Sequence, residues 1–320
     1  MNERYIFGID LGGTTAKLGL FGGKGVLLEK WRIPTDIRDK GKNILPDLAA
    51  SVREHLNAKQ LKAENVTGIG LGVPGEVLNE KTVEPCVNLN GWGGFDVAGA
   101  FSRLCGVSVK AINDANAAAL GELWRGSAKG AQSMYFVAIG TGLGAALVIS
   151  GQIVEGFHGA GGEIGHIIMH TEEARAFGRG KRGRLEQYVS ASGLVRSAAL
   201  LLEGTDEPSL LRQYDEVTAK RIFTHAKQGD VLACQLTEQF ASELGQALAG
   251  ISCVCDPEVI VLGGGVSAAG DYLLNAVQKA YKLYAPVATE NTTIRLATLG
   301  NDAGIYGAAR LMMNKGHTLR

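Results

Sequence analysis

The sequence predicts an α/β fold, and three observations carry this prediction. Short apolar runs typical of strands alternate along the chain with longer stretches that have helical spacing of apolar residues. Gly-rich turns follow three of the apolar runs, at Asp10, Gly140 and Gly263. A strand, a Gly/Thr turn and a second strand recur about 130 residues apart, which favours two halves built on one plan. Chance similarity of two Gly-rich hairpins stays open as an alternative.

The elements of the first half follow from these runs. Residues 5–10 and 16–21 predict two strands joined by the turn Gly12-Gly13-Thr14-Thr15, and residues 25–32 predict a third. Residues 43–57 have helical spacing of apolar residues. Buried strands are expected at 66–73, before Pro74-Gly75, and at 107–112, before Asn113-Asp114. The Ala-rich stretch 115–125 then predicts a helix.

The second half starts with the recurring pattern. Residues 134–139 and 145–149 predict strands on either side of Gly140-Thr141-Gly142-Leu143-Gly144. Residues 235–255 predict a long helix, and residues 259–262 a strand that leads into Gly263-Gly264-Gly265 and a further helix. Residues 304–313 predict a last helix, and the polar, basic stretch 171–183 an exposed loop.

Length and charge limit what the chain can be. Its 320 residues suit two domains of ordinary size with a large core. The 32 basic and 32 acidic residues give a formal net charge of zero, so bulk charge argues for neither a nucleic acid nor an anionic membrane as partner. Neither a signal peptide nor an apolar run near the roughly 20 residues of a membrane span is recognisable, and we expect a cytoplasmic protein.

The five cysteines agree with a reducing compartment. Their number is odd and their spacing forms no disulfide framework. Cys253 and Cys255 form a C-x-C pair with no Cys or His nearby to complete a metal site, so we interpret them as half-buried residues near a helix end.

The three Gly-rich turns suggest phosphate binding. Backbone N–H groups in such turns can surround phosphate oxygens, and glycine lets the backbone approach them closely. None of the turns fits the P-loop pattern G-x-x-x-x-G-K-[ST], and none gives a clean Rossmann fingerprint. One such turn alone would be weak evidence, whereas three together with an acidic residue call for a shared explanation.

Residues 10–17, D-L-G-G-T-T-A-K, resemble the first phosphate motif of the actin-like sugar kinases. Residues 140–144 are similar to the second phosphate motif of that superfamily, and residues 262–265 to its adenosine motif. Within it the chain resembles the ROK family (repressors, open reading frames and kinases) through G-V-P-G at 72–75, N-D-A-N at 113–116, G-G-E-I-G-H at 161–166 and L-E-Q-Y at 185–188. Residues 185–194 and the overall spacing are similar to bacterial glucokinases.

This resemblance covers residues 5 to about 309 and implies a fold. It is the two-domain, actin-like (ribonuclease H-like) sugar kinase fold, with a ligand cleft between the domains. We place the smaller N-terminal domain at residues 1–116 plus 302–320 and the larger C-terminal domain at 117–301. Family members commonly form dimers, which implies a homodimer here.

The resemblance also implies roles for individual residues. Asp114 would be the general base that accepts the proton of a sugar hydroxyl. The other sugar ligands would be Gly75, Asn88, Asn113, Glu163, His166 and Glu186. ATP would lie against Asp10, Gly12, Gly13, Thr14, Thr15, Lys17, Thr141, Gly142, Gly264, Gly265 and residues near Asn301. Asp10 would act near Mg²⁺, through water.

Plainer roles stay open for several of these residues. Asp114 precedes an Ala-rich helix and could be its N-cap, since aspartate is a favoured cap. Asp10 could cap its own turn. Glu163 and His166 lie three residues apart, and on that spacing alone they could be ordinary surface residues.

One segment departs from the ROK pattern. Typical members carry C-x-C-G-x-x-G-C before the L-E dipeptide, where three thiolates and the preceding histidine bind a structural zinc. Phe177, Arg179 and Arg184 stand at the three cysteine positions here, and arginine has no lone pair to give to a metal. We therefore predict no structural zinc, with the loop held by arginines paired with Glu172 or Glu173, or by hydrogen bonds.

Three functions follow as hypotheses. The first is an ATP-dependent kinase that converts D-glucose to glucose 6-phosphate. The second keeps the kinase and changes the sugar to fructose, mannose, allose or an N-acetylhexosamine, because a few pocket contacts set that choice. The third is a non-catalytic sugar-sensing regulator, although the kinase-like body begins at Tyr5, with no room before it for a helix-turn-helix domain.

Overall fold

The computed structural model describes residues 4–176, 181–313 and 318–319, and these form two compact units. The first unit contains residues 1–130, 147–161 and 298–320, and the second contains residues 131–146 and 162–297. The predicted boundaries at 116/117 and 301/302 differ from these divisions. The reason is that the helix that begins at Asp114 packs along its whole length within the first unit, so the chain does not divide at the start of this helix.

The first unit is built on a five-stranded sheet in the order β3-β2-β1-β4-β8. Its strands are β1 (Tyr5–Leu11), β2 (Thr15–Gly22), β3 (Leu27–Pro34), β4 (Val66–Val73) and β8 (Val109–Asn113). β2 runs antiparallel to β1 and β3, while β4 runs parallel to β1 and β8. The carboxyl ends of β1, β4 and β8 therefore lie at one edge, where ligands bind in sheets of this kind.

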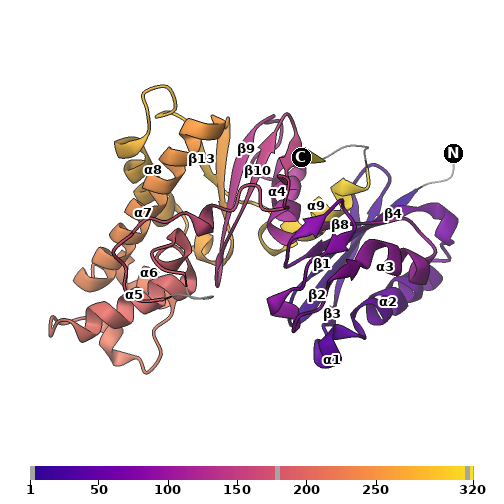
Figure 1. Ribbon diagram of the computed structural model, residues 1–320, viewed down its shortest axis with the longest axis horizontal. Helices are drawn as coiled ribbons and strands as arrows, with labels where there is room; N and C mark the ends of the chain where they lie inside the picture. Colours follow the sequence, from indigo (N-terminus) through magenta and orange to yellow (C-terminus); the bar gives the residue numbers. More distant parts are fainter. Residues whose placement is uncertain (1–3, 177–180, 314–317, 320) are drawn as a thin grey trace. The chain divides into compact units, whose positions relative to one another are not determined.

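Helices cover both faces of this sheet (Figure 1). One face packs its apolar side chains against α2 (Ile44–Ala58) and α3 (Val97–Cys105). The other face packs against α9 (Ala303–Leu311), which also lies along α4 (Asp114–Arg125). Smaller elements complete the unit: α1 (Arg38–Gly41), β5 (Val77–Leu78), β6 (Thr82–Val83), β7 (Phe95–Asp96), β11 (Gln152–Val154) and β14 (Thr318–Leu319).

The second unit repeats the hairpin of the first. β9 (Met134–Ile139) and β10 (Leu143–Ile149) are hydrogen-bonded neighbours, and β12 (Val259–Gly263) pairs with β9 in parallel. β10 begins in the second unit and ends in the first, and β13 (Thr293–Leu296) pairs with β12. The order β10-β9-β12 matches β2-β1-β4, so the predicted recurrence of strand, turn and strand is confirmed.

Among the described residues, four α-helices complete the second unit (Figure 1). They are α5 (Ala191–Glu203), α6 (Ala219–Lys227), α7 (Val231–Cys255) and α8 (Asp271–Tyr284). The five cysteines of the chain are all free, and the thiols of Cys253 and Cys255 donate to carbonyls one turn back in α7, near its end as predicted. Cys255 is half-buried, as predicted, whereas Cys253 is exposed because its side chain lies on the solvent side of the helix. None of the described helices is both long and apolar enough to cross a bilayer.

A buried carboxylate fixes the far end of α4. Glu122 is fully buried, and its two oxygens accept hydrogen bonds from the backbone N–H groups of Ser127, Thr298 and Leu299 at 2.7–3.1 Å. Residues 127 and 298 lie beside 130/131 and 297/298, where the chain passes from one unit to the other. Glu122 therefore ties two of these passages to the helix that begins at Asp114.

We expect Glu122→Gln to destabilise the protein. The amide of glutamine keeps one acceptor oxygen, so its NH₂ group must face the N–H of either Leu299 or Ser127. Leaving one such donor without an acceptor costs about 1–3 kcal/mol of unfolding free energy, which denaturant unfolding would measure.

Glu258→Gln is the matched control. One oxygen of the exposed Glu258 accepts both N–H groups of Gln132 and Ser133, and glutamine keeps an oxygen for that place. Its unfolding free energy should stay within about 0.5 kcal/mol of the wild-type value. Equal stability of the two variants would contradict the role given to Glu122.

Candidate active site

The predicted site residues fall into two groups, one in each unit. The first group contains Asp10, Gly12, Gly13, Thr14, Thr15, Lys17, Gly75, Asn88, Asn113 and Asp114. The second contains Thr141, Gly142, Glu163, His166, Glu186, Gly264 and Gly265. The residues of each group lie near the ends of strands and helices or in the turns between them.

An ion pair opens the first group. Asp10 and Lys17 are directly opposite each other in the β1–β2 hairpin, and the Lys17 ammonium lies 2.9 Å from Oδ2 of Asp10. Residues 12–15 form the turn between them, closed by the Gly12 N–H donating to the carbonyl of Thr15. The hairpin thus holds an acid and a base beside a Gly-rich turn that is exposed at Thr14 and half-buried at its other residues.

Asn88 lies against the same turn. A Cβ atom on Gly13 would come within 2.8 Å of the Asn88 carbonyl oxygen, so a residue with a side chain would push the two segments apart. The predicted phosphate residue Gly13 and the predicted sugar residue Asn88 are therefore neighbours.

Asn113, and not Asp114, is the N-cap of α4. Its side-chain oxygen accepts hydrogen bonds from the N–H groups of Ala115 and Asn116 at 2.9 and 3.1 Å, which satisfies two of the free donors of the first turn. Its amide nitrogen donates to the carbonyl of Gly75 at 3.1 Å. The alternative that Asp114 caps the helix is therefore wrong, and Asp114 is the first helical residue.

The surroundings of Asp114 favour its protonated form. Burial in the protein is the largest cause and the negative charge of Asp10 the second, and together they raise the pKa of Asp114 from 3.8 to about 6. Hydrogen bonds from backbone N–H groups oppose this shift.

The Asp114 side chain is nevertheless exposed to solvent. Its exposure depends only on the atoms in direct contact with it, whereas its pKa also responds to the protein that lies beyond those atoms. The side chain can therefore be exposed while burial raises its pKa. The first layer of atoms decides access, and a hydroxyl can therefore reach this carboxylate.

Glu186 connects two predicted roles in the second group. Its Oε2 accepts a hydrogen bond from the Leu143 N–H at 2.9 Å, and a Cβ on Gly142 would lie 2.6 Å from the same oxygen. A predicted sugar ligand thus lies directly beside the predicted phosphate turn 140–144.

Glu163 and His166 lie at the two ends of one short turn. The 3₁₀ turn η3 (Ile164–His166) begins after Glu163, and Tyr135 donates from its hydroxyl to the carbonyl of the preceding Gly162 at 2.5 Å. Nδ1 of His166 lies 3.1 Å from the guanidinium of Arg184, a contact that no sequence pattern predicts.

The third Gly-rich turn adjoins the second. Gly264 has φ +82°, and a Cβ there would lie 2.4 Å from the carbonyl oxygen of Ile139, the last residue of β9. Both the backbone angle and the close approach favour glycine. The predicted phosphate and adenosine turns therefore meet at the carboxyl ends of β9 and β12.

These features agree with the comparison to known proteins. A sequence profile described as the ROK family matches residues 6–315. The chain belongs to the ROK family.

A glucokinase of Halalkalibacterium halodurans is 36% identical to this ROK chain, over 100% of this chain and 98% of that protein. Two solved structures are also similar. A ROK hexokinase of Thermus thermophilus has a TM-score of 0.82 and 32% identity, covering 96% of this chain and 97% of the other. A ROK family glucokinase of Streptomyces griseus, solved with glucose and AMPPNP, has a TM-score of 0.78 and 30% identity, covering 96% and 98%.

The segment that departs from the ROK pattern is partly described. Phe177 and Arg179 lie outside the described residues, whereas Arg184 and the acids are described. Glu173 accepts hydrogen bonds from the Tyr188 hydroxyl and the Arg196 guanidinium at 2.8 and 2.9 Å. The hypothesis of an arginine paired with Glu173 is thus confirmed, although the arginine comes from α5 rather than from the loop.

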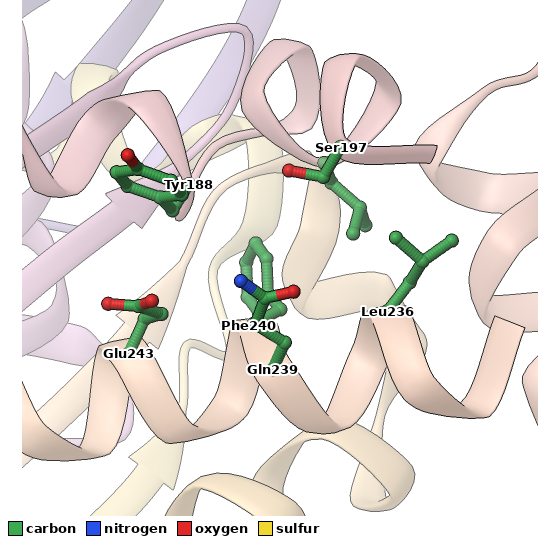
Figure 2. Close-up of a pocket in the computed structure, with 7 residues that line it drawn as sticks. Tyr188, Ser197, Leu236, Gln239, Phe240 and Glu243 are labelled. Carbon is green, nitrogen blue, oxygen red and sulfur yellow. The ribbon is translucent and has the colours of Figure 1, made fainter. Parts of the chain in front are cut away.

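A small cavity lies next to this segment (Figure 2). Tyr188 and Glu243 line one end of it, and its volume of about 10 Å³ holds roughly one water molecule. The cavity is therefore too small for a hexose, and the sugar ligands named above do not line it.

We expect Asp114→Asn to stabilise the protein at neutral pH. A carboxyl group with a raised folded-state pKa loses stability as the pH rises from 3.8 to about 6, because the folded protein holds its proton more tightly than the unfolded chain. Asparagine imitates the protonated form, so the variant should be more stable at pH 7 and equal to wild type near pH 3.

Asp36→Asn should have the opposite effect at pH 7. Hydrogen bonds from Arg38 and Asn43 hold the pKa of Asp36 well below its usual range, so its ionised form stabilises the fold above that range. Thermal unfolding of both variants between pH 3 and 7 would show whether each variant is more or less stable than the wild type. An Asp114→Asn variant that is less stable than the wild type at pH 7 would contradict the conclusion that the ionised form of Asp114 destabilises the fold.

Proposed function

We propose that this ROK chain transfers the γ-phosphoryl group of ATP to a hexose hydroxyl, with D-glucose as the first candidate and glucose 6-phosphate and ADP as products. The observation that carries the proposal is Asp114: a reachable carboxylate with a pKa of about 6, beside Asp10 and its partner Lys17. The glucokinase of H. halodurans and the glucose complex of the S. griseus glucokinase support this choice.

The chemistry assigns a separate task to each group of residues. Asp114 accepts the proton of the sugar hydroxyl as its oxygen attacks the γ-phosphorus, and the bond from that phosphorus to the bridging oxygen of ADP breaks. Lys17 and the N–H groups of turn 12–15 would stabilise phosphate charge. Mg²⁺ bound to ATP would neutralise further charge, with Asp10 facing it through water.

The second group would choose and orient the sugar. Glu163, His166 and Glu186 offer two carboxylates and an imidazole, which pair with hydroxyl groups as acceptors and donors. Glu186 already touches the turn at Gly142, so sugar and phosphate binding share one support. Thr141, Gly264 and Gly265 would contact ATP.

Turnover by Asp114→Asn should fall by at least about a thousandfold while glucose still binds, because asparagine cannot accept the proton. In the wild type, kcat/KM should fall about tenfold for each pH unit below about 6, as Asp114 becomes protonated. A coupled assay of ADP release would measure both. Turnover retained by the variant would rule out this base.

The sugar itself is decided by a panel of substrates. We expect kcat/KM for glucose to exceed the values for fructose, mannose, allose and N-acetylhexosamines, measured by the same assay of ADP release. A higher value for another hexose would move the assignment within the kinase class, in keeping with the name hexokinase for the T. thermophilus relative. Binding of a sugar without turnover of any would instead support the sugar-sensing regulator.

The setting of the enzyme belongs to the same proposal. We propose a homodimer that acts in the cytoplasm, with sugar and ATP as its partners and neither nucleic acid nor membrane. The five free cysteines support the cytoplasm, and the formal net charge of zero supports the absence of nucleic acid and membrane as partners.

A further inference from the structure

The contact between Arg184 and His166 determines which nitrogen of the neutral imidazole carries the proton. Nη1 of Arg184 lies 3.1 Å from Nδ1 of His166. Arginine has hydrogen-bond donors and no acceptor, so Nδ1 must accept and carry no proton. The proton of the neutral ring is then on Nε2, which becomes a hydrogen-bond donor.

The residues around this contact do not fit the zinc site of typical ROK proteins. Arg184 stands where the pattern has its last cysteine, and its guanidinium faces the ring nitrogen of His166. The next histidine, His170, is also occupied, because its Nε2 lies 2.6 Å from Oε1 of Glu243. Within the described ranges, no group of three or more His, Cys, Asp or Glu side chains could hold a metal ion.

We propose that Arg184 is a positioning residue that takes the place of a metal ion at Nδ1 of His166. A cation on Nδ1 and a proton on Nε2 are what a metal would also produce, because it too binds the unprotonated nitrogen. Arg184 thereby presents Nε2–H as the donor to a sugar hydroxyl. This role for His166 rests on the proposed function.

The backbone holds Arg184 beside His166. Residues 167–170 and 183–185 run antiparallel, with an isolated bridge between Ile168 and Arg184. The Leu185 N–H donates to the carbonyl of Ile167 at 2.8 Å, and the Met169 N–H donates to the carbonyl of Gly183 at 2.7 Å. The two segments that carry the imidazole and the guanidinium are thus joined on both sides of the bridge.

Side chains hold the described ends of the loop on either side of residues 177–180. The fully buried Gln187 accepts from the Gly183 N–H and donates to the Arg175 carbonyl at 2.9 and 3.1 Å. Glu173 accepts from the Arg175 N–H, the Tyr188 hydroxyl and the Arg196 guanidinium, and these bonds hold its pKa at about 2. Each end of the loop is therefore attached to the segment of Glu186.

The test compares Arg184→Ala with Arg184→Lys in the full-length protein. Two-dimensional ¹H–¹⁵N spectra of the histidine rings report which nitrogen carries the proton, with a His166→Gln variant to assign the signals. We expect Nε2–H in the wild type, a mixture of tautomers in Arg184→Ala, and recovery of Nε2–H in Arg184→Lys, since lysine also only donates.

Kinetics give the second readout. The KM for the sugar should rise at least about tenfold in Arg184→Ala, while the KM for ATP stays within about twofold, and Arg184→Lys should recover part of the loss. Arg182→Ala, a change to an exposed arginine two residues away, is the control and should alter neither tautomer nor KM.

Three results would overturn the proposal. They are an Arg184→Ala variant with the wild-type tautomer, a wild type with the proton on Nδ1, and one tightly bound zinc per purified chain. Treatment with a chelator should leave the ring spectra unchanged. If the wild type phosphorylates no sugar, the proposed function fails, whereas the spectra still decide the role of Arg184.

Discussion

The close approach of α9 to the sheet and to α4 is the constraint on which the first unit depends. A Cβ on Gly307 would lie 1.6 Å from the Ala117 carbonyl oxygen, and one on Gly70 would lie 1.8 Å from that of Ala308. Any side chain at these positions would separate the layers. α4 begins at Asp114, and a Cβ on Gly304, in the first turn of α9, would lie 2.8 Å from Cγ of Asp10. The packing of α9 therefore helps to set the distance between the two acids, whose charges interact.

The two acids illustrate how one site can hold like charges. Asp10 has an ammonium partner in Lys17, whereas Asp114 receives hydrogen bonds from neutral amide groups. An ion pair compensates the charge of the first carboxylate, and the second keeps a raised pKa. The surroundings of Asp114 therefore lower stability at neutral pH, and they hold a carboxyl group that changes its protonation near pH 6, as a general base would need.

The sequence allowed much of this to be predicted, because local patterns carry strands, turns and helix starts. The predicted strands at 66–73 and 134–139 have the observed bounds, and α4 begins one residue before the predicted start at 115. The capping role of Asn113 was missed because Asp and Asn are equally good caps. Glu122 lies on an Ala-rich helix face, and its partners at 298 and 299 are remote in sequence, so pattern alone could not identify it.

The loop before Glu186 shows most clearly what sequence patterns cannot predict. The sequence shows that the cysteines of the ROK pattern are missing, but it does not show which contacts hold the loop instead. A structural zinc concentrates roughly 10–16 kcal/mol in one site, whereas single hydrogen bonds contribute about 1 kcal/mol each. Order that rests on hydrogen bonds must therefore be spread over many contacts. The buried Gln187 and the hydrogen bonds of Glu173 hold the described ends of the loop. The half-buried Arg184 is not needed for this, and its contact with His166 orients the imidazole. Stability and ligand geometry, joined in a metal site, are here carried by different residues.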